Sequence, residues 1–124
     1  MTKTIALRTE LSRLLKTLTT RVYYEEAPDN AVYPYTVYEL DELGFDYGKT
    51  QYQLEINAFD FGTSTTAVET LSDNIQKALD QYHFINDKIQ FMSYRNQRRI
   101  IREGDKQILR RRMLFEIHLN ETGV

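Results

Sequence analysis

Arginine side chains dominate the chemistry that this sequence offers, and they are concentrated in one segment. Eight of the sixteen Lys and Arg residues lie between positions 95 and 112, where Glu103 and Asp105 are the only acids. Guanidinium groups bind phosphates and carboxylates through paired hydrogen bonds. The segment therefore predicts contact with a polyanion or with a carboxylate-bearing protein surface. Its basic residues are Arg95, Arg98, Arg99, Arg102, Lys106, Arg110, Arg111 and Arg112.

A second segment has the opposite charge. Positions 22–48 contain seven acids and neither Lys nor Arg, although the whole chain has a formal net charge of −2. Charge separated this sharply gives information about partners rather than about the fold. The acids are Glu25, Glu26, Asp29, Glu39, Asp41, Glu42 and Asp46.

The two charged segments allow three interpretations. In the first, 97–103 and 108–114 pair as a hairpin around Gly104 and Asp105, and the arginines contact nucleic-acid phosphates. In the second, the arginines form an ion-pair interface with the acidic segment of a neighbouring subunit. In the third, the hairpin is simply solvated, and its charge prevents edge pairing. The predicted interface residues are Arg95, Arg98, Arg99, Arg102, Arg110, Arg111 and Arg112 against Glu25, Glu26, Asp29, Asp41 and Glu42.

Two observations favour the subunit interface over nucleic acid. The chain is acidic overall, which is unfavourable for a dedicated nucleic-acid binder. No aromatic residue alternates with the basic residues between 98 and 112, so a platform for base stacking is lacking there. We therefore expect no specific nucleic-acid binding.

Residue patterns typical of catalysis or of cofactor binding are scarce. The chain contains no Cys, and neither His83 nor His118 has neighbouring residues that would complete a ligand set. Glu39, Asp41 and Glu42 do not have the spacing of a calcium loop. Phosphate-binding, dinucleotide-binding and nucleophile-elbow motifs are missing, and no apolar run is long enough to span a membrane. We expect no enzymatic activity, no catalytic residue, no cofactor, no metal and no membrane partner.

Hydrophobic periodicity predicts the elements that position the charges. Leucines at helical spacing predict a helix over 4–18, and a second apolar stripe predicts another from Thr66 to about Tyr82. Thr66 and Glu69 are predicted as its capping box, with Ser64 or Thr65 as alternative caps. Alternation predicts strands over 35–40, 52–59, 88–95 and 108–120, after a short β-leaning run at 21–24. Positions 41–49 are predicted as a polar loop, and 97–103 either extends the preceding strand or pairs with it.

This order predicts an α+β fold in one domain covering 1–124. We expect a mostly antiparallel sheet of about four to five strands with two helices packed on one face, in the order α-β-β-β-α-β-β.

The sequence also resembles the tail-completion proteins of long-tailed bacteriophages, which are also called tail-terminator or tail-to-head joining proteins. The similarity begins at Arg21-Val22-Tyr23 and continues through a proline-containing turn to Tyr33-Pro34-Tyr35 at the start of a strand. The strand over 52–60, a Thr/Ser-rich cap, the helix sequence AVETLSDNIQKAL, the basic segment and a closing strand over 113–119 follow in the same order.

The resemblance implies a structural protein without catalytic residues. Members form a ring, typically a hexamer, that caps the completed tail tube and joins it to the head connector. The implied partners are other copies of the chain, the tail-tube protein and the head connector protein, while DNA passes through the ring. The implied location is the tail or neck of the virion, and the host cytoplasm during assembly. The implied alternative is another neck or connector protein of similar size.

Overall fold

A curled sheet of six strands is the framework of the computed structural model, which describes residues 2–122. The strands lie in the spatial order β1-β2-β3-β6-β5-β4. Strand β1 is parallel to β2, and all other neighbours are antiparallel. The strands are β1 (Val22–Tyr24), β2 (Tyr35–Asp46), β3 (Lys49–Phe61), β4 (Tyr82–Ile85), β5 (Ile89–Arg102) and β6 (Ile108–Glu121).

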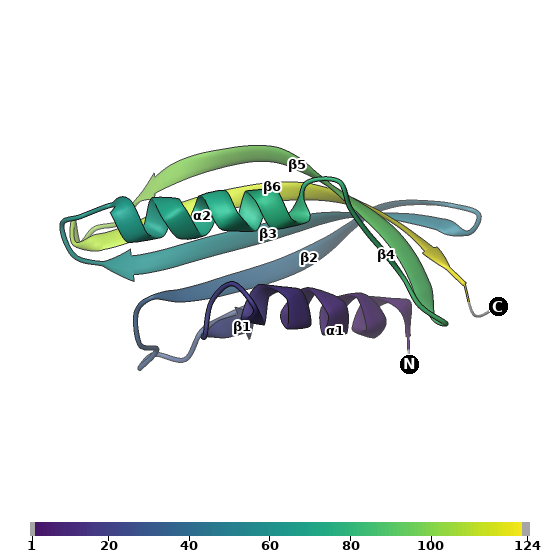
Figure 1. The fold of residues 1–124 in the computed structure, drawn as a ribbon, viewed down its shortest axis with the longest axis horizontal. Coiled ribbons are helices and arrows are strands. Elements are labelled where there is room, and N and C mark those ends of the chain that lie inside the picture. Colours follow the sequence, from purple (N-terminus) through teal and green to yellow (C-terminus); the bar gives the residue numbers. More distant parts are fainter. Residues whose placement is uncertain (1, 123–124) are drawn as a thin grey trace.

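Helices α1 (Lys3–Lys16) and α2 (Thr66–Leu79) bury their apolar stripes in a common core with the sheet (Figure 1). In α1 the stripe is Leu7, Leu11 and Leu15, which are fully buried. The sheet contributes alternate residues of its central strands, including Ile56 and Phe115. We refer to this side of the sheet as the helix side and to the opposite side as the outer face.

Polar contacts fix α1 against the sheet. The buried carboxylate of Glu10 accepts two hydrogen bonds from the Arg13 guanidinium, at 2.8 and 2.7 Å, and one from the Tyr82 hydroxyl at 2.5 Å. Burial opposes ionisation of Glu10, but these hydrogen bonds outweigh it and lower the pKa of the carboxyl below its ordinary value. Because Tyr82 belongs to β4, this network ties α1 to the far edge of the sheet.

The predicted sheet of four to five mostly antiparallel strands is wrong, because the sheet is mixed and has six strands. The run at 22–24 pairs in parallel with β2, since the loop between them returns the chain to the starting end of β2. The additional strand is β4. Helix α2 stops at Leu79 and Gln81 adopts a positive φ of 57°, so Tyr82 begins a strand instead of extending the helix. The observed order is α-β-β-β-α-β-β-β.

The predicted polar loop over 41–49 is also wrong, because β2 continues to Asp46 and turns directly into β3. Tyr47 and Gly48 form the turn with φ values of 30° and 96°, a combination typical of tight hairpins. The last six residues of β2 are all exposed, so they lack the alternating burial that would have predicted a strand. Backbone pairing with β3 holds them extended.

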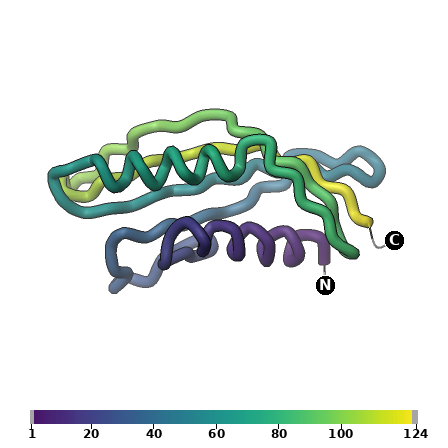
Figure 2. The backbone as a smooth tube through the Cα atoms, in the orientation of Figure 1, coloured from purple at the N-terminus to yellow at the C-terminus, as the bar shows by residue number. Residues whose placement is uncertain are grey.

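Long strands β2 and β5 are each covered along only part of their outer edge. Strand β1 pairs only with Thr36–Tyr38 of β2, and β4 pairs only with Gln90–Ser93 of β5. Beyond a bulge at Asn96, β5 continues along β6 to Arg102. The β2–β3 hairpin and the β5–β6 hairpin lie at opposite ends of the molecule (Figures 1 and 2). None of the described helices has the length and apolar character needed to cross a membrane.

Candidate assembly surfaces

Two arginines of the basic segment point to the helix side and are bound within the subunit. Arg111 is buried on β6, and its Nε donates to Glu69 Oε1 of α2 at 2.5 Å. Arg98 of β5 binds the same carboxylate at 2.9 Å and Asp73 at 2.5 Å. Because Arg111 and Arg98 bind acids of α2, they fasten the helix to the sheet.

Glu69 is the centre of this cluster. Its partial burial favours the neutral form, but hydrogen bonds from Arg111 and Arg98 dominate and lower the pKa of its carboxyl below the ordinary value. The predicted capping box is therefore wrong, because the Glu69 side chain binds these arginines. The N-cap of α2 is Thr65, one of the two alternative caps that the sequence predicted, and its side chain makes no capping hydrogen bond.

Arg110 and Arg112 project from the outer face of β6 and also have partners in the same chain. Arg110 donates to Asn57 Oδ1 at 2.9 Å and to Glu103 at 3.1 Å, and its guanidinium lies 5.3 Å from the centre of the Phe59 ring. Arg112 forms a salt bridge with Glu55 at 3.0 Å. These contacts join β6 to β3 and to the β5–β6 turn.

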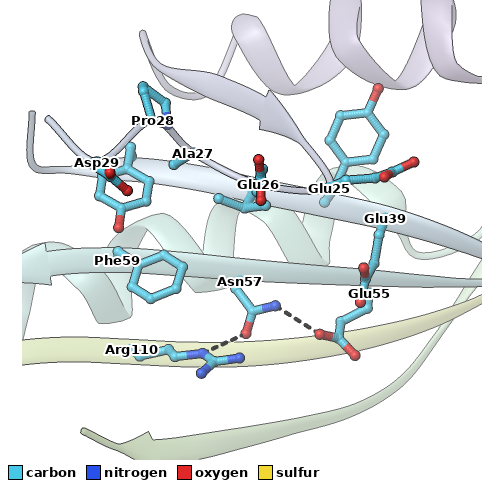
Figure 3. A pocket seen from close by; sticks show the side chains of 13 residues that line it. Glu25, Glu26, Ala27, Pro28, Asp29, Glu39, Glu55, Asn57, Phe59 and Arg110 are labelled. Atoms are coloured by element: carbon cyan, nitrogen blue, oxygen red, sulfur yellow. Dashed lines mark hydrogen bonds between the residues drawn. The ribbon is translucent and has the colours of Figure 1, made fainter. Parts of the chain in front are cut away.

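An open cavity of about 400 Å³ lies on the outer face beside these residues (Figure 3). The loop after β1 contributes Glu25, Glu26 and Asp29, and the sheet contributes Glu39 of β2 with Glu55, Phe59 and Arg110. Burial, together with the nearby charges of Glu55, Asp41 and Glu25, raises the pKa of the Glu39 carboxyl. Part of the predicted acidic surface therefore lines one cavity with Arg110 of the same chain.

An aromatic cluster adjoins this cavity and was not predicted as a surface feature. The Tyr35 and Phe59 rings stack with centroids 4.9 Å apart, and Tyr33 contacts both Tyr35 and Phe61. Cross-strand pairing of Tyr35 with Phe59 produces the stack. The sequence signal was the alternation of aromatic residues at 33 and 35 and at 59 and 61.

Arg95, Arg99 and Arg102 are exposed, and none of them forms a salt bridge with a described residue. The backbone N–H of Arg95 donates to Asp80 Oδ1 at 3.1 Å, so this N–H is not free to pair with another strand. Arg99 and Arg102 lie further along β5, where β6 is its only strand neighbour among the described residues.

Asp41 and Glu42 do not line the outer-face cavity, because they lie on the exposed half of β2 that leads to the β2–β3 hairpin. Glu42 has a long contact of 3.6 Å with Lys3, and its side chain remains half exposed. The structure thus divides the predicted acidic surface into an outer-face cavity and a hairpin at one end of the molecule.

Asp73 and Glu69 are the acids that sequence reasoning missed as partners of the arginines. The sequence did indicate such a partner, because Arg111 interrupts the alternating apolar residues of the strand, which include Leu109 and Met113 and face the core. A buried arginine requires a carboxylate or another acceptor nearby, and the two predicted helices were the elements expected to cover one face of the sheet. Within residues 2–122, no cluster of three or more His, Cys, Asp or Glu side chains is arranged to hold a metal ion.

The fold and these surfaces define a small α+β protein with exposed acids on β2 near the β2–β3 hairpin and exposed arginines on β5 near the β5–β6 hairpin. A solved structure titled "Virion of native gene transfer agent (GTA) particle" contains a chain of similar fold. The TM-score is 0.67 at 11% sequence identity, and the match covers 86% of this chain and 84% of that chain. This likeness is one of fold. No protein-family model matches the sequence, and no curated protein matches it significantly.

Proposed function

We propose that this protein is a structural component of a phage or phage-like virion, and that it forms a ring at the end of the tail tube. The observation that carries the proposal is the fold shared with a chain of a gene transfer agent virion, over most of the length of both chains. The proposed ring, a hexamer on the tail, contacts the tail-tube protein on one side and the head connector protein on the other.

The distribution of charge supports assembly with other copies. A head-to-tail ring needs two different surfaces on each subunit that are complementary to one another. Arg99 and Arg102 supply exposed positive charge near one end of the molecule, and Asp41 and Glu42 supply negative charge near the other. Arg98, Arg110, Arg111 and Arg112 have partners within the subunit, so the proposed interface is smaller than the basic segment.

The same contacts favour protein over DNA as the partner. A phosphate-binding surface needs several free cations along one face, and four of the seven predicted interface arginines are neutralised by acids of their own chain. DNA passing through the ring would then meet no dedicated binding surface. The proposal places the protein in the tail or neck of the virion, with no catalytic role.

The test is to delete the gene from a phage or prophage that encodes this chain and to examine the particles by electron microscopy. We expect tails of uncontrolled length that are not joined to heads, and restoration of both properties by the wild-type gene. Tails of normal length without heads would instead favour another neck or connector protein. Complete particles with normal tails would contradict the proposal.

A further inference from the structure

The unpaired parts of β2 and β5 are complementary edges. On β2, the edge becomes free after Tyr38, whose carbonyl accepts a hydrogen bond from Glu25 N–H at 2.8 Å. On β5, the edge becomes free after Arg95, whose backbone N–H donates a hydrogen bond to Asp80 Oδ1. Along Asp41–Asp46 and 97–102, β3 and β6 respectively are the only strand neighbours in the described chain. An edge of this kind presents unpaired backbone N–H and C=O groups that can bind another strand.

We propose that the free edge of β2, Asp41–Asp46, pairs as an additional strand with the free edge of β5, residues 97–102, of a second copy of this chain. The inference rests on the proposed function, because it specifies how copies join in the ring. Backbone hydrogen bonds would supply the contact, as in other cases of strand addition. The paired segments have the same length.

Charge selects this combination of edges. Asp41, Glu42 and Asp46 make the β2 edge acidic, and the exposed Arg99 and Arg102 make the β5 edge basic. Two β2 edges would repel one another, as would two β5 edges, whereas a β2 edge attracts a β5 edge. Charged residues on an edge usually prevent any strand pairing. Here they exclude only the pairing of two identical edges. The resulting contact is head-to-tail, as a ring requires.

Apolar side chains on the two edges also match. Phe45 pairs with buried Thr50, and Ile100 pairs with buried Arg111, so both lie on the helix side of the sheet. Phe45 is 60% exposed and Ile100 is 56% exposed. Antiparallel pairing of the two segments sets Phe45 opposite position 98, so Ile100 is its diagonal neighbour on the same face of the continuous sheet, within reach of an apolar contact.

Strand direction gives the pairing its geometry. Three antiparallel steps, β2 to β3, β3 to β6 and β6 to β5, make β2 and β5 run in opposite directions. Rotation about a ring axis preserves direction along that axis, so β2 of one copy meets β5 of the next in antiparallel orientation. The free edges lie toward opposite ends of the molecule (Figure 1). A closed ring therefore requires strands tilted to its axis, as in a barrel.

Cross-linking tests the contact, because the native chain has no cysteine. Phe45→Cys and Ile100→Cys would be purified separately, mixed at high concentration and treated with a short bismaleimide, which tolerates a small shift in register. We expect a dimer joined between positions 45 and 100 in the mixture and little product from either variant alone. The matched control is Ile85→Cys. Ile85 is 58% exposed and lies on β4, the outermost strand beside β5. This variant should give no product with Phe45→Cys.

A second pair of variants tests the selection by charge. Arg99→Glu with Arg102→Glu should abolish the 45–100 product, and Asp41→Lys with Glu42→Lys in the partner should restore it. Absence of the 45–100 product with the wild-type charges, or an equal product with position 85, would overturn the edge pairing. Such a result would leave the tail phenotype of the gene deletion unchanged. Failure of the proposed function would appear in that deletion, whatever the cross-links show.

Discussion

Arg111 and Arg99 lie on neighbouring strands of one sheet, yet they have different surroundings. Arg111 points to the helix side, where it is buried and binds Glu69. Arg99 points to the outer face, is exposed and forms no salt bridge in the described chain. The comparison shows that residue type alone does not assign a role, because the acids that the fold brings within reach decide which arginines hold the subunit together and which remain available to a partner.

The largest expected effect is on the stability of the subunit. Arg111→Ala removes the buried guanidinium and its hydrogen bonds to the charged Glu69, and we expect a loss of about 2 kcal/mol in the free energy of unfolding. Urea denaturation measures the change. The control is Arg99→Ala, which should change the free energy of unfolding by less than about 0.5 kcal/mol. Equal losses in the two variants would contradict the distinction between the arginines.

The next effect is a dependence of stability on pH. Hydrogen bonds from Arg111 and Arg98 place the pKa of Glu69 in the folded protein below its value in the unfolded chain, which is about 4.5. The Glu69 contribution is therefore complete above the unfolded pKa and is lost as the pH falls through the folded pKa. Glu69→Gln should be less stable than the wild type at pH 7, and the difference should shrink at acidic pH.

Chemical denaturation at several pH values tests this dependence. The exposed Glu121→Gln serves as the control and should leave the stability profile close to that of the wild type. Glu10 also has a lowered pKa and remains in both variants, so each should retain some sensitivity to acid. A constant difference between the wild type and Glu69→Gln across this range would show that ionised Glu69 does not bind the arginines as described.

The smallest effect concerns the acidic cavity of the outer face. Burial and neighbouring carboxylates raise the pKa of Glu39, so the folded state disfavours its ionised form. Glu39→Gln should increase the free energy of unfolding by about 0.5 kcal/mol at neutral pH, the scale of a partly exposed charge interaction. The gain should disappear below the unfolded pKa, where Glu39 is protonated in both states. A decrease at neutral pH would indicate that the Glu39 charge is stabilised.

Much of the fold could be predicted from local patterns. The leucine stripe of α1 and the alternation of Tyr52, Leu54 and Ile56 in β3 gave the correct element types, because each pattern matches one buried face. The far half of β2 could not be predicted in this way. Its residues are exposed on both faces and are held mainly by backbone pairing with β3, which has no side-chain signature. The parallel pairing of β1 depends on the path of a loop, which periodicity does not encode.

The sequence by itself determined that the protein has two segments of opposite charge and the apolar periodicity for helices and strands. It also contained the anomaly of Arg111 in an inward-facing series. Only the tertiary structure decided which charges meet, because partners such as Glu69 and Arg111 are distant in sequence and are joined by the packing of α2 on β6. It likewise decided which strand edges remain free, since an edge exists only when the order and length of neighbouring strands are fixed.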